Sequence, residues 1–101
     1  MVSKYTPHKE KQIENSIKEY ITNLGGLCYK IHGGDLYQET GIPDLLVCYK
    51  GLFMGIEVKD PGGKASAIQL AQGARIQKAG GHFLIAKSLQ DVVNYMEEKG
   101  L

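Results

Sequence analysis

Two carboxylates and one lysine have the residue types and spacing for metal-assisted chemistry. Asp44 follows Pro43, Glu57 comes after a gap of twelve residues, and Lys59 is two positions further on. Hard divalent cations such as Mg²⁺ prefer oxygen ligands and are usually held by one or two carboxylates and waters. Such an ion polarises a phosphate oxygen, and a nearby ammonium group stabilises negative charge that develops on a phosphoryl group. The three residues therefore suit hydrolysis of a phosphodiester bond.

The stretch from 53 to 59 alternates like a β-strand with one buried face. The alternation predicts three core residues: Met54, Ile56 and Val58. Glu57 and Lys59 then share the opposite face, and Gly55 precedes them there without a side chain. Two charged groups side by side on a central strand are unusual for an ordinary buried strand, so a functional site is expected on this face.

Asp44 is expected to enter the partner strand of a hairpin. Only a turn around Gly51 separates the two strand candidates, and such proximity favours antiparallel pairing. Pro43 stiffens the backbone that leads into Asp44. In a hairpin that turns at Gly51, Asp44 comes near Glu57, so that two carboxylates could converge on one point with Lys59 beside them.

Seven elements are expected to position these residues. Apolar residues at helical spacing predict the first helix: Ile13, Ile17, Tyr20, Ile21 and Leu24. The full expected order is helix 9–24, strands 27–32, 42–50 and 52–59, helix 67–79, strand 82–87 and helix 90–99. In the second helix Ala67, Leu70, Ala71 and Ala74 share a face, and in the third Val92, Val93 and Met96 point inward. The turn-rich stretch 60–64 is expected to be an exposed, mobile loop. This α-β-β-β-α-β-α order predicts an α/β fold.

Length and composition fit a single globular domain over residues 1–101 and leave its function open. Of the 101 residues, 43% are hydrophobic and 23% are charged, which excludes a disordered chain. No apolar run approaches the roughly 18 residues of a membrane span, and the polar start lacks a secretory signal, so a cytoplasmic protein is expected. The net charge is only +1, so any contact with nucleic acid must come from local concentrations of positive charge.

The two cysteines, Cys28 and Cys48, are expected to be buried reduced thiols inside strands. A zinc site made from them and the three histidines, at 8, 32 and 82, is disfavoured because no pair has the short spacing of a structural zinc site. The histidines are therefore interpreted as surface or loop residues.

Pro43-Asp44 followed by Glu57-Val58-Lys59 resembles the signature of the PD-(D/E)XK nucleases. More narrowly, the sequence resembles the virus-type replication-repair nuclease domain, VRR-NUC, at Gly41-Ile42-Pro43-Asp44, at Ile56-Glu57-Val58-Lys59 and at Gln69. The Holliday-junction resolvases are more distant relatives of that domain. The resemblance covers nearly the whole chain and implies a restriction-endonuclease-like core with a central mixed sheet flanked by helices. It implies Asp44, Glu57 and the Val58 carbonyl as metal ligands and Lys59 as the catalytic lysine.

That family also carries a glutamate on its first helix, and Glu10 and Glu14 are both candidates. At 100° per residue, Glu10 lies roughly 35° from the centre of the apolar stripe and Glu14 roughly 75° from it. A carboxylate within the apolar stripe of a helix is unusual, so its presence there indicates a function. Glu10 is therefore preferred, either binding the ion through water or supporting a second ion, with Glu14 in reserve.

Five further residues are candidates for contacts at the site or with DNA. Gln69 matches a family glutamine, which implies contact with the metal-bound water, Lys59 or the DNA backbone. Ser66 and Gln69 also have the spacing of a capping box, and the two roles can coexist. Lys30 matches a family lysine and is a candidate phosphate contact. The remaining candidates for DNA binding, which could equally be solubility charges, are Lys64, Arg75 and Lys78.

Residues and resemblance together predict a Mg²⁺- or Mn²⁺-dependent endonuclease that hydrolyses DNA. The resemblance implies branched DNA, a Holliday junction or a flap, as the substrate during viral or phage replication, recombination or repair, in a bacterial or phage-infected cell. A domain this small covers few base pairs, so a homodimer is expected. A single arginine and no recognition-helix pattern argue against reading of base sequence. The alternatives are a catalytically silent nucleic-acid-binding module on the same fold and a small structural α/β protein.

Overall fold

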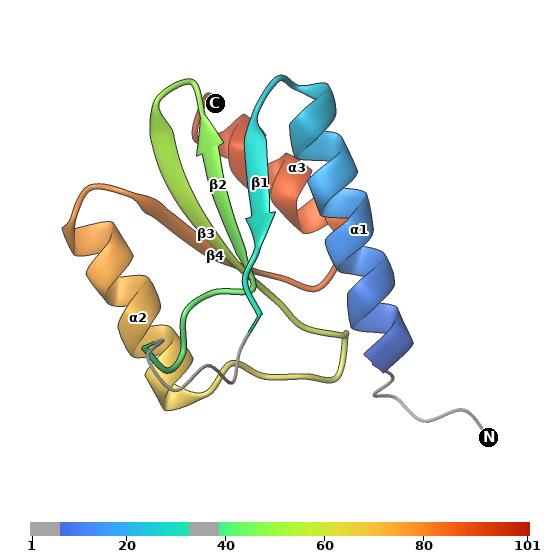
Figure 1. Cartoon of the computed structure of the whole chain (residues 1–101), viewed down its shortest axis with the longest axis vertical. Coiled ribbons are helices and arrows are strands. Elements are labelled where there is room, and N and C mark those ends of the chain that lie inside the picture. Colours follow the sequence, from blue (N-terminus) through green and yellow to red (C-terminus); the bar gives the residue numbers. More distant parts are fainter. Residues whose placement is uncertain (1–6, 33–38) are drawn as a thin grey trace.

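The computed structural model describes residues 7–32 and 39–101, with the side chains of residues 7 and 8 left out of account. A four-stranded sheet lies between helices on its two faces (Figure 1). The elements are α1 Pro7–Asn23, β1 Leu27–Lys30, β2 Leu45–Tyr49, β3 Leu52–Val58, α2 Ala67–Lys78, β4 His82–Ala86 and α3 Leu89–Glu98. Their order is the expected one. The strands are shorter than predicted, and Asp44 lies one residue before β2 rather than within it.

The sheet is mixed, with strand order β1-β2-β3-β4. The first three strands pair antiparallel, and β4 pairs parallel to β3 after the crossover through α2. Leu45 lies opposite Ile56 in the β2–β3 hairpin, which brings the residue before β2 level with Glu57. The hairpin register therefore sets the two predicted carboxylates across from each other.

One face of the sheet forms the core with α1 and α3. The face predicted from alternation in β3 is confirmed, because Met54, Ile56 and Val58 are each no more than 1% exposed. The helices contribute buried residues at the expected spacing: Ile13, Ile17, Ile21, Val92 and Met96. Leu24, by contrast, is 41% exposed, because the helix has already ended at Asn23.

Helix α2 covers part of the opposite face, and the prediction for its packing face was wrong. Leu70 is 49% exposed, whereas Gly73 is buried. A Cβ built on Gly73 would come within 2.4 Å of the Phe83 ring on β4, so only a glycine permits this close approach. The alanines suggested an apolar stripe, but the contact is made through a glycine that carries no hydrophobic signal of its own.

Two other local expectations are corrected. Cys48 is exposed rather than buried, because it lies on the sheet face that α1 does not cover, whereas Cys28 is buried as expected. The loop 60–64 is not exposed throughout: Asp60 is fully buried and its Oδ1 accepts a hydrogen bond of 2.8 Å from the backbone N–H of Gly62. Within the described residues, no helix has the length and apolar character needed to cross a membrane.

Candidate active site

Asp44 is held by contacts from two neighbouring strands. Its backbone carbonyl accepts a hydrogen bond of 2.8 Å from the N–H of Ile31, just after β1. Its Oδ2 accepts a hydrogen bond of 2.8 Å from the backbone N–H of Val58. Its Oδ1 lies 3.8 Å from Nζ of Lys30. The carboxylate is therefore anchored at the end of the hairpin, as the turn at Gly51 predicted.

Glu57 is almost completely buried, with 2% of its surface exposed. Its Oε1 accepts a hydrogen bond of 3.2 Å from Nε2 of Gln69 and lies 3.9 Å from Nζ of Lys59. Its Oε2 has no hydrogen-bond partner among the described residues. A buried carboxylate oxygen without a partner costs free energy, so Oε2 is an atom that a bound cation would satisfy.

Burial and Asp44 together raise the pKa of Glu57 to about 8. Loss of hydration is the largest cause, because burial disfavours the charged form. The neighbouring Asp44 carboxylate adds to the rise, because two carboxylates side by side disfavour ionisation of Glu57, while Lys59 and Lys30 oppose it. Two carboxyl groups this close in a buried place bind a proton readily, and a divalent cation could replace that proton.

Lys59 and the Val58 carbonyl complete the group of residues predicted at this place. The backbone N–H of Lys59 donates to the carbonyl of Ala86 at 3.0 Å, which ties the end of β3 to β4. The N–H and the carbonyl of a strand residue point to the same side of the strand, so the Val58 carbonyl is directed to the side of Asp44. The side chain of Lys59 is 19% exposed, so its ammonium group is partly shielded beside Glu57.

Helix α2 packs closely on the segments that carry the carboxylates because two glycines make room for it. A Cβ on Gly55 would lie 2.9 Å from the ring of Pro43 and 2.8 Å from Ile76, so the bare backbone makes room for both. Gly41 has a φ of +84°, which favours glycine, and a Cβ there would lie 3.0 Å from the carbonyl oxygen of Ile68. These two glycines allow α2 to place Gln69 beside Glu57.

Gln69 forms the capping box considered from the sequence, and it also contacts Glu57; its predicted functional role stays a prediction. Its Oε1 accepts a hydrogen bond of 2.8 Å from the N–H of Ser66, and its own N–H donates to Oγ of Ser66, which together form the capping box. Its Nε2 donates to Glu57. One amide therefore caps α2 and ties the helix to the buried carboxylate.

Lys30 links the first helix to the site. Its Nζ lies 2.6 Å from Oε1 of Glu14 and 3.8 Å from Oδ1 of Asp44. Glu14, the reserve choice, is therefore connected to the site through a lysine. Glu10 lies one turn earlier, in the first turn of α1, and is partly exposed. Its preference over Glu14 stays a prediction.

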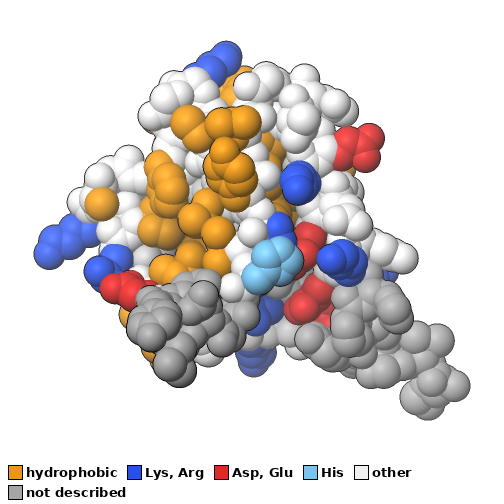
Figure 2. All heavy atoms as spheres, in the orientation of Figure 1, with side chains coloured by type: hydrophobic (Ala, Val, Ile, Leu, Met, Phe, Trp, Pro, Cys, Tyr) orange, Lys and Arg blue, Asp and Glu red, His pale blue; other side chains and the backbone are white. Residues whose placement is uncertain are grey.

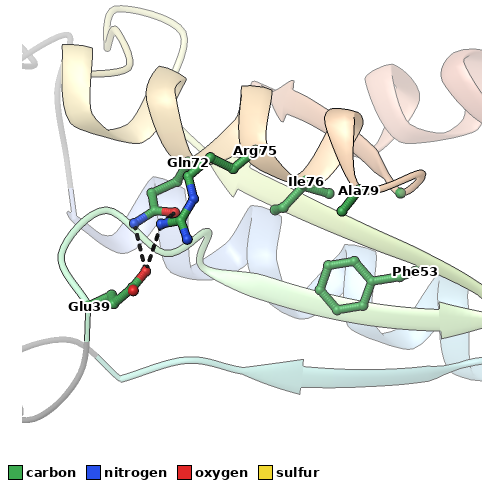
Figure 3. Close-up of a pocket in the computed structure, with 7 residues that line it drawn as sticks. Glu39, Phe53, Gln72, Arg75, Ile76 and Ala79 are labelled. Atoms are coloured by element: carbon green, nitrogen blue, oxygen red, sulfur yellow. Dashed lines mark hydrogen bonds and ion pairs between the residues drawn. The ribbon is translucent and has the colours of Figure 1, made fainter.

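The other predicted DNA contacts have no hydrogen bond or ion pair with Asp44 or Glu57 among the described residues. Lys64 is exposed in the loop before α2, and Arg75 and Lys78 are in the last turn of that helix. Arg75 donates to Oε2 of Glu39 at 3.0 Å, and the pair lines a pocket of about 390 Å³ whose other walls include Phe53 (Figure 3). This pocket contains none of the predicted metal ligands.

The residues present fit a hard divalent cation. The donors at hand are the Asp44 carboxylate, the Glu57 carboxylate with its orphaned buried Oε2, and the Val58 carbonyl on the side of Asp44. Within residues 7–32 and 39–101, no cluster of three His, Cys, Asp or Glu side chains forms a metal site. A cation held here would thus rely on two carboxylates, the carbonyl and waters, the kind of shell that Mg²⁺ accepts.

Comparisons with known proteins decide the family. No family model matches the chain. A protein named "Putative nuclease p44" of Acyrthosiphon pisum secondary endosymbiont phage 1 is 33% identical over 85 residues, covering 83% of this chain and 87% of that protein. A solved structure described as a VRR_NUC domain is 32% identical, covers 88% of this chain and 95% of its own, and has a TM-score of 0.74. The chain belongs to the VRR-NUC family.

More distant structures share the VRR-NUC fold. A second VRR_NUC domain protein has 15% identity and a TM-score of 0.68, covering 88% of this chain and 85% of its own. The Archaeoglobus fulgidus protein Hjc, a Holliday junction resolvase, has 18% identity and a TM-score of 0.59, covering 75% of this chain and 65% of its own. The resemblance and the fold class predicted from the sequence are thereby confirmed.

One feature beside the VRR-NUC carboxylates was missed in the sequence. Lys11, Lys18 and His32 line a pocket together with Glu14 and Lys30. The signal was present, because residues 11, 14 and 18 share one face of a helix. Their common face with a strand lysine became visible only in the folded chain.

The two roles of Gln69 predict different results for two neighbouring substitutions. Gln69→Ala and Ser66→Ala each remove part of the capping box and should destabilise the protein by about 1 kcal/mol. That is a fall of roughly 4–8 °C in Tm for a domain of this size. Only Gln69→Ala also removes the donor to Glu57, so only that variant should change Mn²⁺ affinity. Calorimetry measures both quantities, and equal affinities in the two variants would leave Gln69 with a structural role alone.

Proposed function

We propose that this VRR-NUC protein is an endonuclease that hydrolyses DNA phosphodiester bonds with Mg²⁺ or Mn²⁺. The observation that carries the proposal is the buried Glu57, with an unsatisfied oxygen, beside the Asp44 carboxylate and the Lys59 ammonium. An ordinary folded protein avoids burying such a group. The phage nuclease relative agrees with the assignment.

Each residue has a distinct part in the proposed reaction. Asp44, Glu57 and the Val58 carbonyl would hold the cation, which when bound supplies Lewis acidity to the phosphate. Lys59 orients the attacking water and stabilises the negative charge that grows on the phosphoryl oxygens. The water oxygen forms a bond to phosphorus and loses a proton, while one sugar–phosphate P–O bond breaks and its sugar oxygen takes up a proton to leave as a hydroxyl. Gln69 holds Glu57 in its orientation from the N-terminus of α2.

Branched DNA is the proposed substrate, within phage replication, recombination or repair in the bacterial cytoplasm. The support is the fold shared with Hjc, which is described as a Holliday junction resolvase. The decisive experiment incubates the purified protein with labelled four-way junction, flap, duplex and single-stranded DNA, with Mg²⁺, with Mn²⁺ and with chelator. Incision of a branched substrate with either metal, and none with chelator, is expected. Metal-independent binding without any incision would instead identify a catalytically silent binding module.

The choice of helix carboxylate is tested by a matched pair one turn apart. Glu10→Gln and Glu14→Gln remove the same charge from the same helix. If Glu10 assists the cation, as we propose, its variant should lose at least tenfold in the cleavage rate and Glu14→Gln should lose less. A larger loss of cleavage rate in Glu14→Gln than in Glu10→Gln would show that Glu14 is the residue that assists the cation. Lys30 already connects Glu14 to Asp44. Cleavage rates at saturating Mn²⁺ measure the difference.

We propose a homodimer, supported by apolar side chains on the open face of the sheet. Leu27 and Tyr29 on the edge strand β1 are 57% and 63% exposed, and Phe53 on β3 is 46% exposed. Figure 2 shows hydrophobic side chains gathered over the strands on this face. Contiguous apolar surface of this kind marks interaction sites.

A double substitution on β1 tests the dimer. Leu27→Ser with Tyr29→Ser should shift the mass measured by light scattering from dimer to monomer, because the apolar surface to be buried is lost. The matched control is Ile68→Ser with Leu70→Ser, which removes two α2 side chains of 47% and 49% exposure and should leave a dimer. A monomeric wild type, or equal effects of both doubles, would contradict this surface.

A further inference from the structure

A basic pocket lies between α1 and the end of β1, outside the group of proposed metal ligands. It has a volume of about 220 Å³ and three lysines in its lining: Lys11, Lys18 and Lys30. His32 and Glu14 also line it, so one carboxylate faces three ammonium groups. In Figure 2, basic side chains lie on the α1 side of the apolar patch, with acidic side chains among them. The pocket therefore combines a hollow with an excess of positive charge.

The charges of this pocket are only partly neutralised within the protein. Lys30 is engaged by Glu14 at 2.6 Å and lies 3.8 Å from Asp44. No ion pair involves Lys11 or Lys18 in the described part of the chain. Both side chains are exposed and stand two turns apart on the same face of α1. Two lysines held at this spacing by a helix are available to an anionic ligand.

The position of Lys30 joins the pocket to the proposed catalytic centre. The same ammonium group lines the pocket and lies next to Asp44, so a ligand in the pocket would be adjacent to the phosphate being cleaved. On the other side of the sheet, Arg75 is paired with Glu39, and the pocket there is lined by Phe53, Ile76 and Ala79. An extended polyanion that passes the carboxylates meets more unpaired positive charge toward α1 than toward the end of α2.

We propose that the pocket between α1 and β1 binds backbone phosphates of the DNA strand next to the scissile phosphate. The inference rests on the proposed nuclease function and assigns Lys11, Lys18 and His32 to substrate binding. The ligand is the phosphodiester backbone rather than the bases, because lysine ammonium groups act as point charges on phosphates and carry little sequence information. A DNA strand bound in this way runs from Asp44 to the pocket between α1 and β1.

Salt dependence of DNA binding tests the pocket directly. Each phosphate contact on duplex DNA contributes about 0.9 to the slope of log K against log salt, so loss of two lysines should reduce the slope by about 2. Lys11→Gln with Lys18→Gln is measured by fluorescence anisotropy with a labelled duplex and a labelled four-way junction, without metal. Binding should weaken on both DNAs, with the slope falling as stated. Mn²⁺ binding should be unchanged, because neither lysine is a proposed ligand.

A control double variant removes the same positive charge from a part of the surface away from the pocket. Lys50→Gln with Lys99→Gln changes residues in the β2–β3 turn and at the end of α3, at the opposite end of the sheet from Asp44 (Figure 1). Its slope should stay at the wild-type value. If the two double variants give equal salt slopes, the pocket does not bind backbone phosphates, whether or not the variants cleave DNA. If the wild type neither cleaves DNA nor binds Mn²⁺ but the first double alone loses DNA binding, the nuclease function fails and the phosphate pocket stands.

Discussion

Asp44→Asn is expected to lower metal-dependent cleavage by at least about 10²–10³-fold, the size of effect seen when one group that stabilises the transition state is lost. The fold should survive, because the asparagine side chain keeps an oxygen that can accept the hydrogen bond from the Val58 N–H. Only the negative charge is lost, and that charge is what a divalent cation needs. Cleavage of the branched substrate measures activity, calorimetric titration measures Mn²⁺ affinity, and thermal unfolding checks the fold.

A second carboxylate provides the matched control for this substitution. Asp91 also accepts a hydrogen bond from a backbone N–H, that of Lys87 at 2.9 Å, but is exposed at the start of α3. Asp91→Asn should leave both cleavage and Mn²⁺ affinity at wild-type values. Wild-type cleavage by Asp44→Asn would remove this residue from the proposed site.

Lys59→Ala distinguishes the effect on DNA cleavage from the effect on metal binding at the proposed centre. The variant keeps Asp44 and Glu57, so it should still bind Mn²⁺, but cleavage should be lost because the ammonium group beside Glu57 is gone. If Lys59→Ala cleaves at the wild-type rate, the lysine has no part in catalysis and Glu57 and Lys59 form only an ion pair.

The metal-free protein should become less stable as pH rises from about 5 to above 8. The pKa of Glu57 is about 8 in the folded chain and near 4.5 when the group is free, so over this range the folded state binds more protons than the unfolded state. The contribution of Glu57 to stability is complete below its unfolded pKa and is lost as the pH passes through the folded value. Thermal unfolding in chelator, from pH 5 to 9, measures the trend.

Metal binding should have the opposite pH dependence through the same group. Below pH 8 a cation must displace the proton on Glu57, so Mn²⁺ affinity should rise by up to tenfold per pH unit and level off above about 8. The stabilisation by Mn²⁺ should therefore be larger at pH 8.5 than at pH 6. Affinities that are independent of pH would show that Glu57 is not a ligand.

Glu57→Gln is the control for both trends, because glutamine is similar in shape and does not titrate. The metal-free variant should be more stable than wild type at pH 8.5 and nearly equal to it at pH 5, and its pH profile should be flatter. It should not cleave DNA. A profile as steep as that of wild type would assign the pH dependence to another group.

Local sequence patterns were enough to predict the order of the elements and the approach of Asp44 to Glu57 and Lys59. The other residues of the proposed centre, the Val58 carbonyl, Glu10 and Gln69, were predicted from the family resemblance and stay predictions. Alternation in residues 53–59 placed Glu57 and Lys59 opposite the core residues, and the short turn at Gly51 brought Asp44 level with Glu57. Both are properties of neighbouring residues in a strand or hairpin, where the period of two and the turn position set the geometry. The capping box of Gln69 is local in the same sense.

Contacts between side chains from distant segments could be known only from the tertiary structure. Lys30 connects Glu14 to Asp44, α2 packs through Gly73 on Phe83, Cys48 is exposed, and Lys11 and Lys18 face the same pocket as Lys30. None of these follows from helix or strand periods, because each depends on how far one element shifts and rotates against another. Periodicity specifies the face of an element, whereas packing of side-chain volumes specifies its partner. The proposed chemistry could thus be predicted from local spacing and family resemblance, whereas the proposed path of the DNA rests on how α1 packs beside β1.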